Sequence, residues 1–297
     1  PLLEYRKVSK IVSSFGDALL SKINPKTGRL HGNYWQLGSQ AGRMTSSNPN
    51  LQQIPREKEF RSCFIASPNH KLIIADYSQI ELRIAAELTN DKTMLTAYQN
   101  SEDLHKLTAS IVLNKPLDAV TKDDRQIAKS ANFGLVYGAS VNGFRSYAES
   151  NYGIRLSEQE AETIRANFFK SYAGLGEWHK TTKHKVYNQE LELTRTLGDR
   201  IRYFDTPSPQ QALNTPVQGT GADILKLALG KLVSTLKPFN AKILATVHDE
   251  IILEAHESVA NEVSKVLSDV MVEAGKEFLR LVPVEAEGTI AESWAEK

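Results

Sequence analysis

The first group of candidate functional residues centres on a carboxylate, Asp76, which follows a short apolar run, KLIIA, at residues 71–75. A run of this kind after a Ser-Pro-Asn turn signal is typical of a buried strand. Ser78 and Glu81 form an S-x-x-E pattern, which predicts a capping box at the start of a helix over about 79–88. Asp76 is therefore expected at a strand end, where side chains often point into clefts. A plain turn or capping aspartate would have the same local sequence.

The second group consists of two basic and two aromatic side chains at intervals of four residues: Arg125, Lys129, Phe133 and Tyr137. Each interval turns an α-helix by about 400°, so the four side chains stay near one slowly winding face. Two cations one turn apart suit a polyphosphate, and an aromatic ring one turn further suits stacking on a base or a sugar. The alternative is an amphipathic helix with a cationic end. Asn132 and Gly134 lie between apolar residues, and a simple core-facing helix explains them poorly.

The third group, His248, Asp249 and Glu250, lies between the apolar runs 242–247 and 251–255. Two apolar runs around a three-residue polar tip predict a buried hairpin. Acidic residues are common in turns, so a turn without function is the plain interpretation. Unpaired carboxylates beside a hydrophobic sheet are nevertheless costly. Mg²⁺ would offset this cost, because it takes hard oxygen ligands from one or two carboxylates and from substrate phosphates.

The elements that must position these groups are mostly helices. Residues 24–56 are rich in Gly, Ser, Asn, Pro and Gln and are expected to be loop and turn. Helical patterns cover 5–22, with a break at Gly16, and then 103–113, 122–136, 157–187 as one or two helices, and about 258–280.

Composition limits the class of protein. The 297 residues are 41% hydrophobic and 24% charged, which excludes a disordered chain, a collagen and a coiled coil and predicts one large or two modest domains. The single cysteine, Cys63, excludes an internal disulfide framework and a four-cysteine metal site, and favours a reduced intracellular setting. No apolar run approaches the roughly 20 residues of a spanning helix, and the N-terminus has no signal-peptide pattern.

Charge is unevenly distributed along the chain, although the net charge is only +1. Residues 1–75 hold 11 Lys and Arg against 4 Asp and Glu, whereas residues 241–297 hold 5 against 12. The basic front part fits a polyanionic partner, and an ordinary solvated surface explains the same charge equally well.

Taken together, the three groups resemble motifs A, B and C of family A DNA polymerases, the family of bacterial DNA polymerase I. The shared patterns are DYSQIELR, R-x3-K-x3-F-G-x2-Y-G and VHDE, in this order. Supporting segments are TGRLH (27–31), AGRMTSSNPNLQQIP (41–55), DLHKLTA (103–109), NTPVQGTGAD (214–223) and the closing Gly288 to Trp294. The resemblance covers essentially the whole chain.

The resemblance implies an α+β right-hand polymerase fold, with an antiparallel palm sheet flanked by helices, a helical fingers domain and a mostly absent thumb. The expected domains are a remnant of the thumb at 1–25, the palm at 26–83 and 186–297, and the fingers at 84–185. The resemblance leaves no segment of these 297 residues for a proofreading or 5′-nuclease domain, so neither is expected within them. The chain is therefore expected to be a monomeric fragment, once fused to further N-terminal domains.

The resemblance also implies two Mg²⁺ ions, about 3.5–4 Å apart, held by Asp76, Asp249 and the backbone carbonyl of Tyr77. One ion would lower the pKa of the primer 3′-hydroxyl, and the other would neutralise charge on the triphosphate and the pyrophosphate. Asp76, Asp249 and Lys129 are the implied catalytic residues, with Lys129 also expected to protonate the leaving pyrophosphate.

The other implied contacts are with the incoming deoxynucleoside triphosphate and with a primer-template DNA duplex. The nucleotide-binding residues would be Gln79, Glu81, His105, Arg125, Lys129, Phe133 and Tyr137. The DNA-binding residues would be Arg43, Asn214, Gln218 and His248. The chain departs from the usual Gly-Arg-Arg-Arg-like run at 199–202, so the stretch 199–213 is interpreted only as basic and near template or primer phosphates.

Glu81 has two interpretations: the capping-box glutamate, and a steric gate that excludes a ribose 2′-hydroxyl. The leading hypothesis for the whole chain is a DNA-dependent DNA polymerase. Glu81 argues against a single-subunit RNA polymerase, and intact Asp76, Asp249 and Lys129 argue against a non-catalytic DNA-binding remnant. Reverse transcription of RNA templates stays open. The expected location is the cytoplasm or an organelle, without secretion or membrane attachment.

Overall fold

The computed structural model describes residues 2–297, with side-chain environments for all of them except residues 3 and 7. The chain forms two compact units. The first comprises Pro1–Asp76, Leu229–Val270 and Ala286–Lys297, and the second comprises Tyr77–Ala228 and Met271–Glu285. The two units are defined by the contacts within the chain. The boundaries expected for the palm and the fingers remain a prediction.

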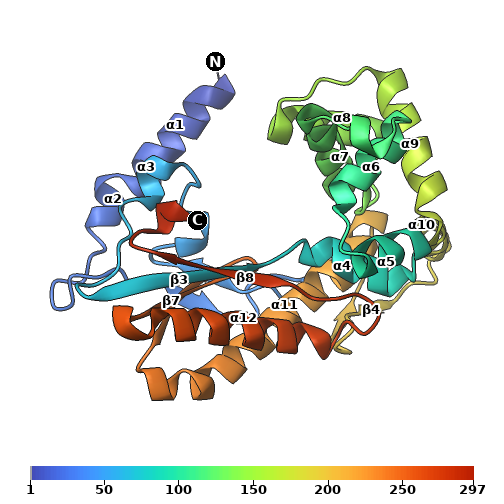
Figure 1. Ribbon diagram of the computed structural model, residues 1–297. Helices are drawn as coiled ribbons and strands as arrows, with labels where there is room; N and C mark the ends of the chain where they lie inside the picture. Colours follow the sequence, from blue (N-terminus) through green and yellow to red (C-terminus); the bar gives the residue numbers. More distant parts are fainter. Residues whose placement is uncertain (1) are drawn as a thin grey trace. The chain divides into compact units, whose positions relative to one another are not determined.

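A four-stranded sheet forms the centre of the first unit (Figure 1). Its strands, in the order β6-β7-β3-β8, are β6 (Lys242–Val247), β7 (Glu250–His256), β3 (His70–Tyr77) and β8 (Ala286–Ala291). Strand β7 pairs antiparallel with both β6 and β3. The register places Ile74 opposite Ile252 and Asp76 opposite Glu250. The strand expected at 71–75 and the hairpin around 248 are thus both present.

Both faces of this sheet carry apolar side chains, because β3 and β7 read as nearly continuous apolar runs. On one face, Leu72, Ile74 and Ile252 pack with Ile54 and Trp294. Successive residues of a strand point to opposite faces, so Asp76 and Glu250 extend this same face at the end of β3. The fully buried Ile73 and Ala75 lie on the other face.

Helix α12 (Ala260–Lys276) runs along the sheet in Figure 1. Within the first unit it buries Val263 and Leu267 completely, four residues apart as an apolar helix face requires. The first unit also contains α1 (Leu2–Phe15), α2 (Asp17–Leu20), β1 (Asn33–Trp35), β2 (Thr45–Ser47) and α3 (Lys58–Arg61). The predicted break at Gly16 is confirmed, since α1 ends at Phe15, and 24–56 is mostly loop and turn as expected.

The second unit is mainly helical. Its helices are α4 (Ile80–Thr89), α5 (Lys92–Gln99), α6 (Leu104–Leu113), α7 (Lys122–Leu135), α8 (Val141–Tyr152), α9 (Glu158–Ser171) and α10 (Ala173–Tyr187). A hairpin of β4 (Leu193–Arg195) and β5 (Ile201–Tyr203) then leads into α11 (Pro209–Thr235), which continues into the first unit. Phe144, Phe168 and Tyr172 are fully buried among these helices. The helices predicted at 103–113 and 122–136 are confirmed within one residue at each end, and 157–187 forms two helices.

The predicted capping box at Ser78 and Glu81 is wrong. Helix α4 is capped at its N-terminus by Gln79, whose backbone is left-handed with φ 52°, and this cap has no side-chain hydrogen bond. This left-handed backbone replaces the extended cap conformation that a capping box needs. Capping boxes do form at Thr121 and Ser157, at the starts of α7 and α9.

Candidate active site

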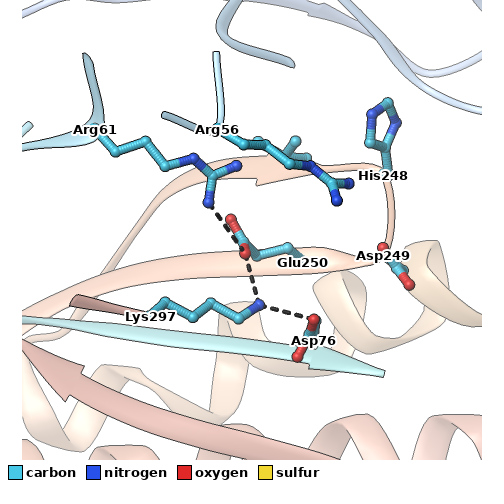
Figure 2. A pocket seen from close by; sticks show the side chains of 8 residues that line it. Arg56, Arg61, Asp76, His248, Asp249, Glu250 and Lys297 are labelled. Carbon is cyan, nitrogen blue, oxygen red and sulfur yellow. Dashed lines mark hydrogen bonds and ion pairs between the residues drawn. The ribbon is translucent and has the colours of Figure 1, made fainter. Parts of the chain in front are cut away.

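Asp76, His248 and Asp249 line one pocket of the first unit (Figure 2). The other lining residues are Arg56, Arg61, Val247, Glu250 and Lys297. Asp76 comes from the end of β3, and the other two come from the turn between β6 and β7. The antiparallel pairing of β3 with β7 places the end of one strand beside the start of the other. This pairing brings two acidic motifs, far apart in the sequence, to the same end of the sheet.

The turn between β6 and β7 has two residues, His248 and Asp249, and the predicted three-residue tip is one residue too long. Glu250 already belongs to β7, where it pairs with Val247 and with Asp76. The Thr246 hydroxyl donates to the Glu250 carbonyl at 2.9 Å, which extends the ladder up to the turn. His248 has a positive φ of 59°, as tight two-residue hairpin turns require.

Glu250 is buried, and its carboxylate is held by the side chains around it. Trp294 Nε1 donates to Oε1 at 2.8 Å, and Lys297 Nζ donates to Oε2 at 2.6 Å. The Arg61 guanidinium lies 4.0 Å from Oε2 and stacks over the Trp294 ring at 4.3 Å. Burial lowers the pKa of Arg61, while the charge of Glu250 opposes this shift. Glu250 therefore anchors the C-terminal segment to the sheet.

Lys297 contacts a second carboxylate as well, because its Nζ lies 2.9 Å from Asp76 Oδ2 (Figure 2). Its side chain is 18% exposed, and that of Asp76 is 47% exposed. One ammonium group thus bridges the catalytic candidate Asp76 and the buried Glu250. The contact shows that this end of the sheet attracts cations.

The donor set at this pocket fits Mg²⁺. Asp76 and Asp249 offer hard carboxylate oxygens, and Glu250 is already engaged by Trp294 and Lys297. Among residues 2–297, no three His, Cys, Asp or Glu side chains are grouped as a self-sufficient metal site. Mg²⁺ is usually held by one or two carboxylates, with water and substrate phosphates completing its shell. Tyr77 follows Asp76 at the end of β3, and its phenol donates to the Met271 carbonyl at 2.8 Å, so only its backbone is suited to a metal.

In the second unit, the basic and aromatic stripe lies on one partly exposed side of α7 and of the turn after it. Arg125, Lys129, Phe133 and Tyr137 are all half-buried. Ala128, Ala131 and Leu135, which lie between them in the sequence, are fully buried. The predicted single face is therefore present, although Tyr137 lies two residues beyond the end of the helix.

His105 lies beside this stripe, in the first turn of α6. Its ring is 5.7 Å from the Phe133 ring, and its Nδ1 is 2.8 Å from Asn132 Nδ2. Burial, helped by the positive charge of Arg125, lowers the pKa of His105 to about 4. Asp103 caps α6 and also accepts a hydrogen bond from Arg125 Nε at 2.6 Å. The structure thus groups the nucleotide-binding candidates of α6 and α7.

Glu81 and Gln79, the other two nucleotide-binding candidates, contact aromatic side chains of the same unit. The Tyr137 hydroxyl donates to the Glu81 carboxylate. The Tyr98 hydroxyl donates to Gln79 Oε1 at 3.3 Å. A residue of the predicted stripe therefore contacts the Glu81 carboxylate and helps to position it.

The four DNA-binding candidates are spread over several elements. Arg43 lies in the loop between β1 and β2, and His248 lies in the pocket of the first unit. Asn214 and Gln218 are one turn apart on α11 and both are half-buried. The side-chain oxygen of Asn214 is buried without a hydrogen-bond partner within the part of the chain that the structure describes. Such an acceptor suits a donor from a ligand, because leaving it unmet costs about 1–3 kcal/mol.

The arginines of the stretch 199–213 make internal contacts. Arg200 bonds Asp223 at 2.8 Å and the Gly219 carbonyl at 3.0 Å. Arg202 donates to the Thr215 hydroxyl at 2.7 Å. Both therefore attach the β4–β5 hairpin to α11, and a contact with nucleic-acid phosphates stays a prediction.

Comparison with known proteins identifies the family. The model of DNA polymerase family A matches residues 1–296. This chain belongs to DNA polymerase family A. DNA polymerase I of Aquifex aeolicus is 41% identical over 296 residues, covering 99% of this chain and 50% of that protein. The thermostable DNA polymerase I of Thermus aquaticus is 35% identical over 99% of this chain and 36% of its own length.

A solved structure confirms the expected fold. The POL domain of Pol1 from M. smegmatis, in complex with DNA primer-template and dNTP, matches with a TM-score of 0.87 at 30% identity. The match covers 99% of this chain and 53% of that one. The chain therefore has the α+β fold of a polymerase domain, and it spans between about one third and one half of the relatives that it matches. None of the helices within residues 2–297 is long and apolar enough to cross a membrane.

Sequence patterns did not indicate most of the residues that surround Asp76 and Asp249 in the pocket of this family A chain. Glu250 was visible inside the VHDE motif, but its burial and its role as an anchor depend on Trp294 and Lys297. Arg56, Arg61 and Lys297 come from segments without a spacing pattern that indicates chemistry. Only the fold brings them to the pocket, so no local signal could have found them.

Proposed function

We propose that this chain is the catalytic part of a DNA-directed DNA polymerase, which adds deoxynucleotides to the 3′ end of a primer and releases pyrophosphate. One observation carries the proposal: in a family A chain, Asp76 and Asp249 line one pocket at the end of a sheet. The M. smegmatis relative, solved with DNA primer-template and dNTP, supports the same partners for this chain.

In this proposal Asp76, Asp249 and the Tyr77 carbonyl hold two Mg²⁺ ions. When bound, such a pair lowers the pKa of the primer 3′-hydroxyl and neutralises charge on the attacking and leaving oxygens. The 3′-oxygen forms a bond with the α-phosphorus while the bond from that phosphorus to pyrophosphate breaks. The protein contributes position and charge, which is what phosphoryl transfer mostly requires.

The stripe on α7 binds the incoming triphosphate. Arg125 and Lys129 contribute positive charge one helical turn apart, and Asp103 orients Arg125 through the 2.6 Å hydrogen bond. Lys129 gives a proton to the leaving pyrophosphate, while Phe133 stacks on the nucleotide. His105, which is neutral because of its lowered pKa, donates a hydrogen bond to the triphosphate without adding charge.

Selection of the sugar depends on Glu81 in this proposal. Its carboxylate accepts the Tyr137 hydroxyl, which holds the side chain in one position. A fixed side chain excludes a ribose 2′-hydroxyl better than a mobile one. Gln79 lies two residues before Glu81 and completes this part of the nucleotide site, and Tyr137 lies where the templating base enters.

The duplex is contacted through its minor groove by Arg43, Asn214, Gln218 and His248. Minor-groove contacts suit a polymerase, because the acceptors that bases present there differ little between base pairs. These base acceptors need donors from the protein, which the Arg43 guanidinium, the His248 ring and the amide nitrogens of Asn214 and Gln218 can supply.

Primer extension by this chain with Mg²⁺, on matched DNA and RNA templates, tests the proposal. Extension on DNA that stops when Mg²⁺ is chelated is the expected result. Duplex binding without extension would instead identify a non-catalytic DNA-binding protein. Extension on the RNA template would add reverse transcription to the activity.

A further inference from the structure

Four buried polar side chains form a continuous network inside the second unit. They are His105 and Thr108 on α6, Asn132 on α7 and Tyr172 at the end of α9. Each is at most 3% exposed. In the sequence, the polar Asn132 lies between apolar residues, which a helix that only faces a hydrophobic core does not account for. Buried amides are costly unless both ends are hydrogen-bonded, so its contacts have a defined direction.

The contacts of Asn132 define which end of the amide faces His105. Asn132 Oδ1 lies 3.1 Å from the Thr108 hydroxyl, which lies 2.7 Å from the Tyr172 hydroxyl. In one arrangement that satisfies these groups, Tyr172 donates to Thr108, and Thr108 donates to the amide oxygen. The amide nitrogen, 2.8 Å from His105 Nδ1, can then only donate. In this arrangement His105 Nδ1 is an acceptor, and the single proton of the neutral ring lies on Nε2.

The Thr108 hydroxyl has two competing acceptors, the Tyr172 hydroxyl at 2.7 Å and the Leu104 carbonyl at 2.7 Å. This carbonyl lies four residues earlier in α6 and also accepts the helical N–H of Thr108. If the Thr108 proton pointed there, Asn132 would turn its amide, and the ring proton would move to Nδ1. The tautomer of His105 therefore reports which arrangement the network adopts.

We propose that Asn132 is a positioning residue, which holds His105 as the Nε2–H tautomer so that the ring donates a hydrogen bond to a triphosphate oxygen. This inference rests on the proposed nucleotide-binding role of His105. The charged groups around the ring are Asp103, Arg125 and Lys129. A neutral donor adds a directed hydrogen bond beside the two cations without adding to their mutual repulsion.

The first test is the tautomer itself, measured by nitrogen NMR on the chain with labelled histidine, with His105→Gln used to assign the signal. The Nε2–H form is expected in the unmodified chain. Asn132→Asp keeps the shape but replaces the donor by an acceptor, so the Nδ1–H ring, whose Nε2 has no proton to donate, is expected. An Nδ1–H ring in the unmodified chain would overturn the inference.

The second test measures nucleotide use. Asn132→Asp is expected to raise KM for the deoxynucleotide at least about tenfold, because an aligned hydrogen bond to a charged phosphate is lost. In the His105→Gln background the same change is expected to have little effect, since Asn132 acts only through His105. If Asn132→Asp raised KM by the same factor in the unmodified chain and in the His105→Gln chain, the role of Asn132 would be purely structural. That result would overturn the inference.

The melting temperature of each variant shows whether it folds, and Thr108→Val provides a second way to disturb the amide if Asn132→Asp does not fold. The NMR result does not depend on activity. An Nε2–H ring in a chain that extends no primer would therefore contradict the proposed function and leave the network intact.

Discussion

The ammonium nitrogen of Lys297 lies 2.9 Å from Oδ2 of Asp76, a carboxylate that we assign to metal binding. The same nitrogen lies 2.6 Å from Oε2 of Glu250, which is buried. A divalent cation that takes the same oxygen of Asp76 must displace this ammonium group or share the oxygen with it. Lys297 and the metal therefore compete for one carboxylate, while Glu250 keeps the lysine nearby.

Lys297→Met is expected to bind Mg²⁺ or Mn²⁺ more tightly, by about thirtyfold, in the absence of nucleotide. The reason is that the repulsion between a unit charge and a divalent ion about 4 Å apart is about 2 kcal/mol in water. Calorimetric titration with the metal alone measures this affinity. Lys297→Arg keeps the charge and is the matched control. Weaker metal binding by Lys297→Met than by Lys297→Arg would show that the lysine supports the site and does not compete with the metal.

Asp76→Ala and Asp249→Ala are each expected to reduce primer extension to below about a hundredth of the unmodified chain. In the proposed site both metal ions need each of these carboxylates, so the double variant is expected to lose little more than either single one. Binding of primer-template is expected to stay within a few-fold, as fluorescence anisotropy can measure. Asp118→Ala, at an exposed position, is the control. Substantial extension by either variant would exclude that carboxylate from catalysis.

Glu81→Ala is expected to increase ribonucleotide incorporation, relative to deoxyribonucleotide, by about a hundredfold, the order of discrimination that a shaped pocket achieves against one hydroxyl. The loss of helix stability that a capping box would predict is not expected, because Gln79 and not Ser78 caps α4. Competitive incorporation measures the selectivity. Tyr137→Phe removes the donor to Glu81 but keeps the carboxylate, so it should relax selectivity less. Unchanged selectivity in Glu81→Ala would remove Glu81 from the sugar site.

Phe133→Tyr is expected to improve the use of dideoxynucleotides relative to deoxynucleotides by about a hundredfold, or about 2.7 kcal/mol at 1.36 kcal/mol per decade. A deoxynucleotide can bond its own phosphate through the 3′-hydroxyl, and a tyrosine hydroxyl can take the place of this group when it is missing. Single-nucleotide kcat/KM values for the two substrates give the ratio. If Phe133 were only a core aromatic, the added hydroxyl would lower both values together and leave the ratio unchanged.

Local patterns predicted the main elements of this protein because the forces that form those elements are local. The apolar run before Asp76 forms β3, and the four-residue spacing from Arg125 to Phe133 lies on one face of α7. The prediction at Ser78 failed for a reason that is not local. Tight passage from β3 into α4 gives Gln79 a left-handed backbone, and the Tyr137 hydroxyl contacts Glu81.

By itself, the sequence determined which residues can do chemistry and which family they belong to, because residue types and short spacings are written in it directly. Only the tertiary structure decided which of them meet. The register of β3 against β7 places Asp76 beside Glu250 and the Asp249 turn, and the end of the chain brings Lys297 to both Asp76 and Glu250. Packing of α6 against α7 brings the Asn132 amide within hydrogen-bond distance of the His105 ring. These contacts depend on sheet register and on helix packing between distant segments, which no local spacing encodes.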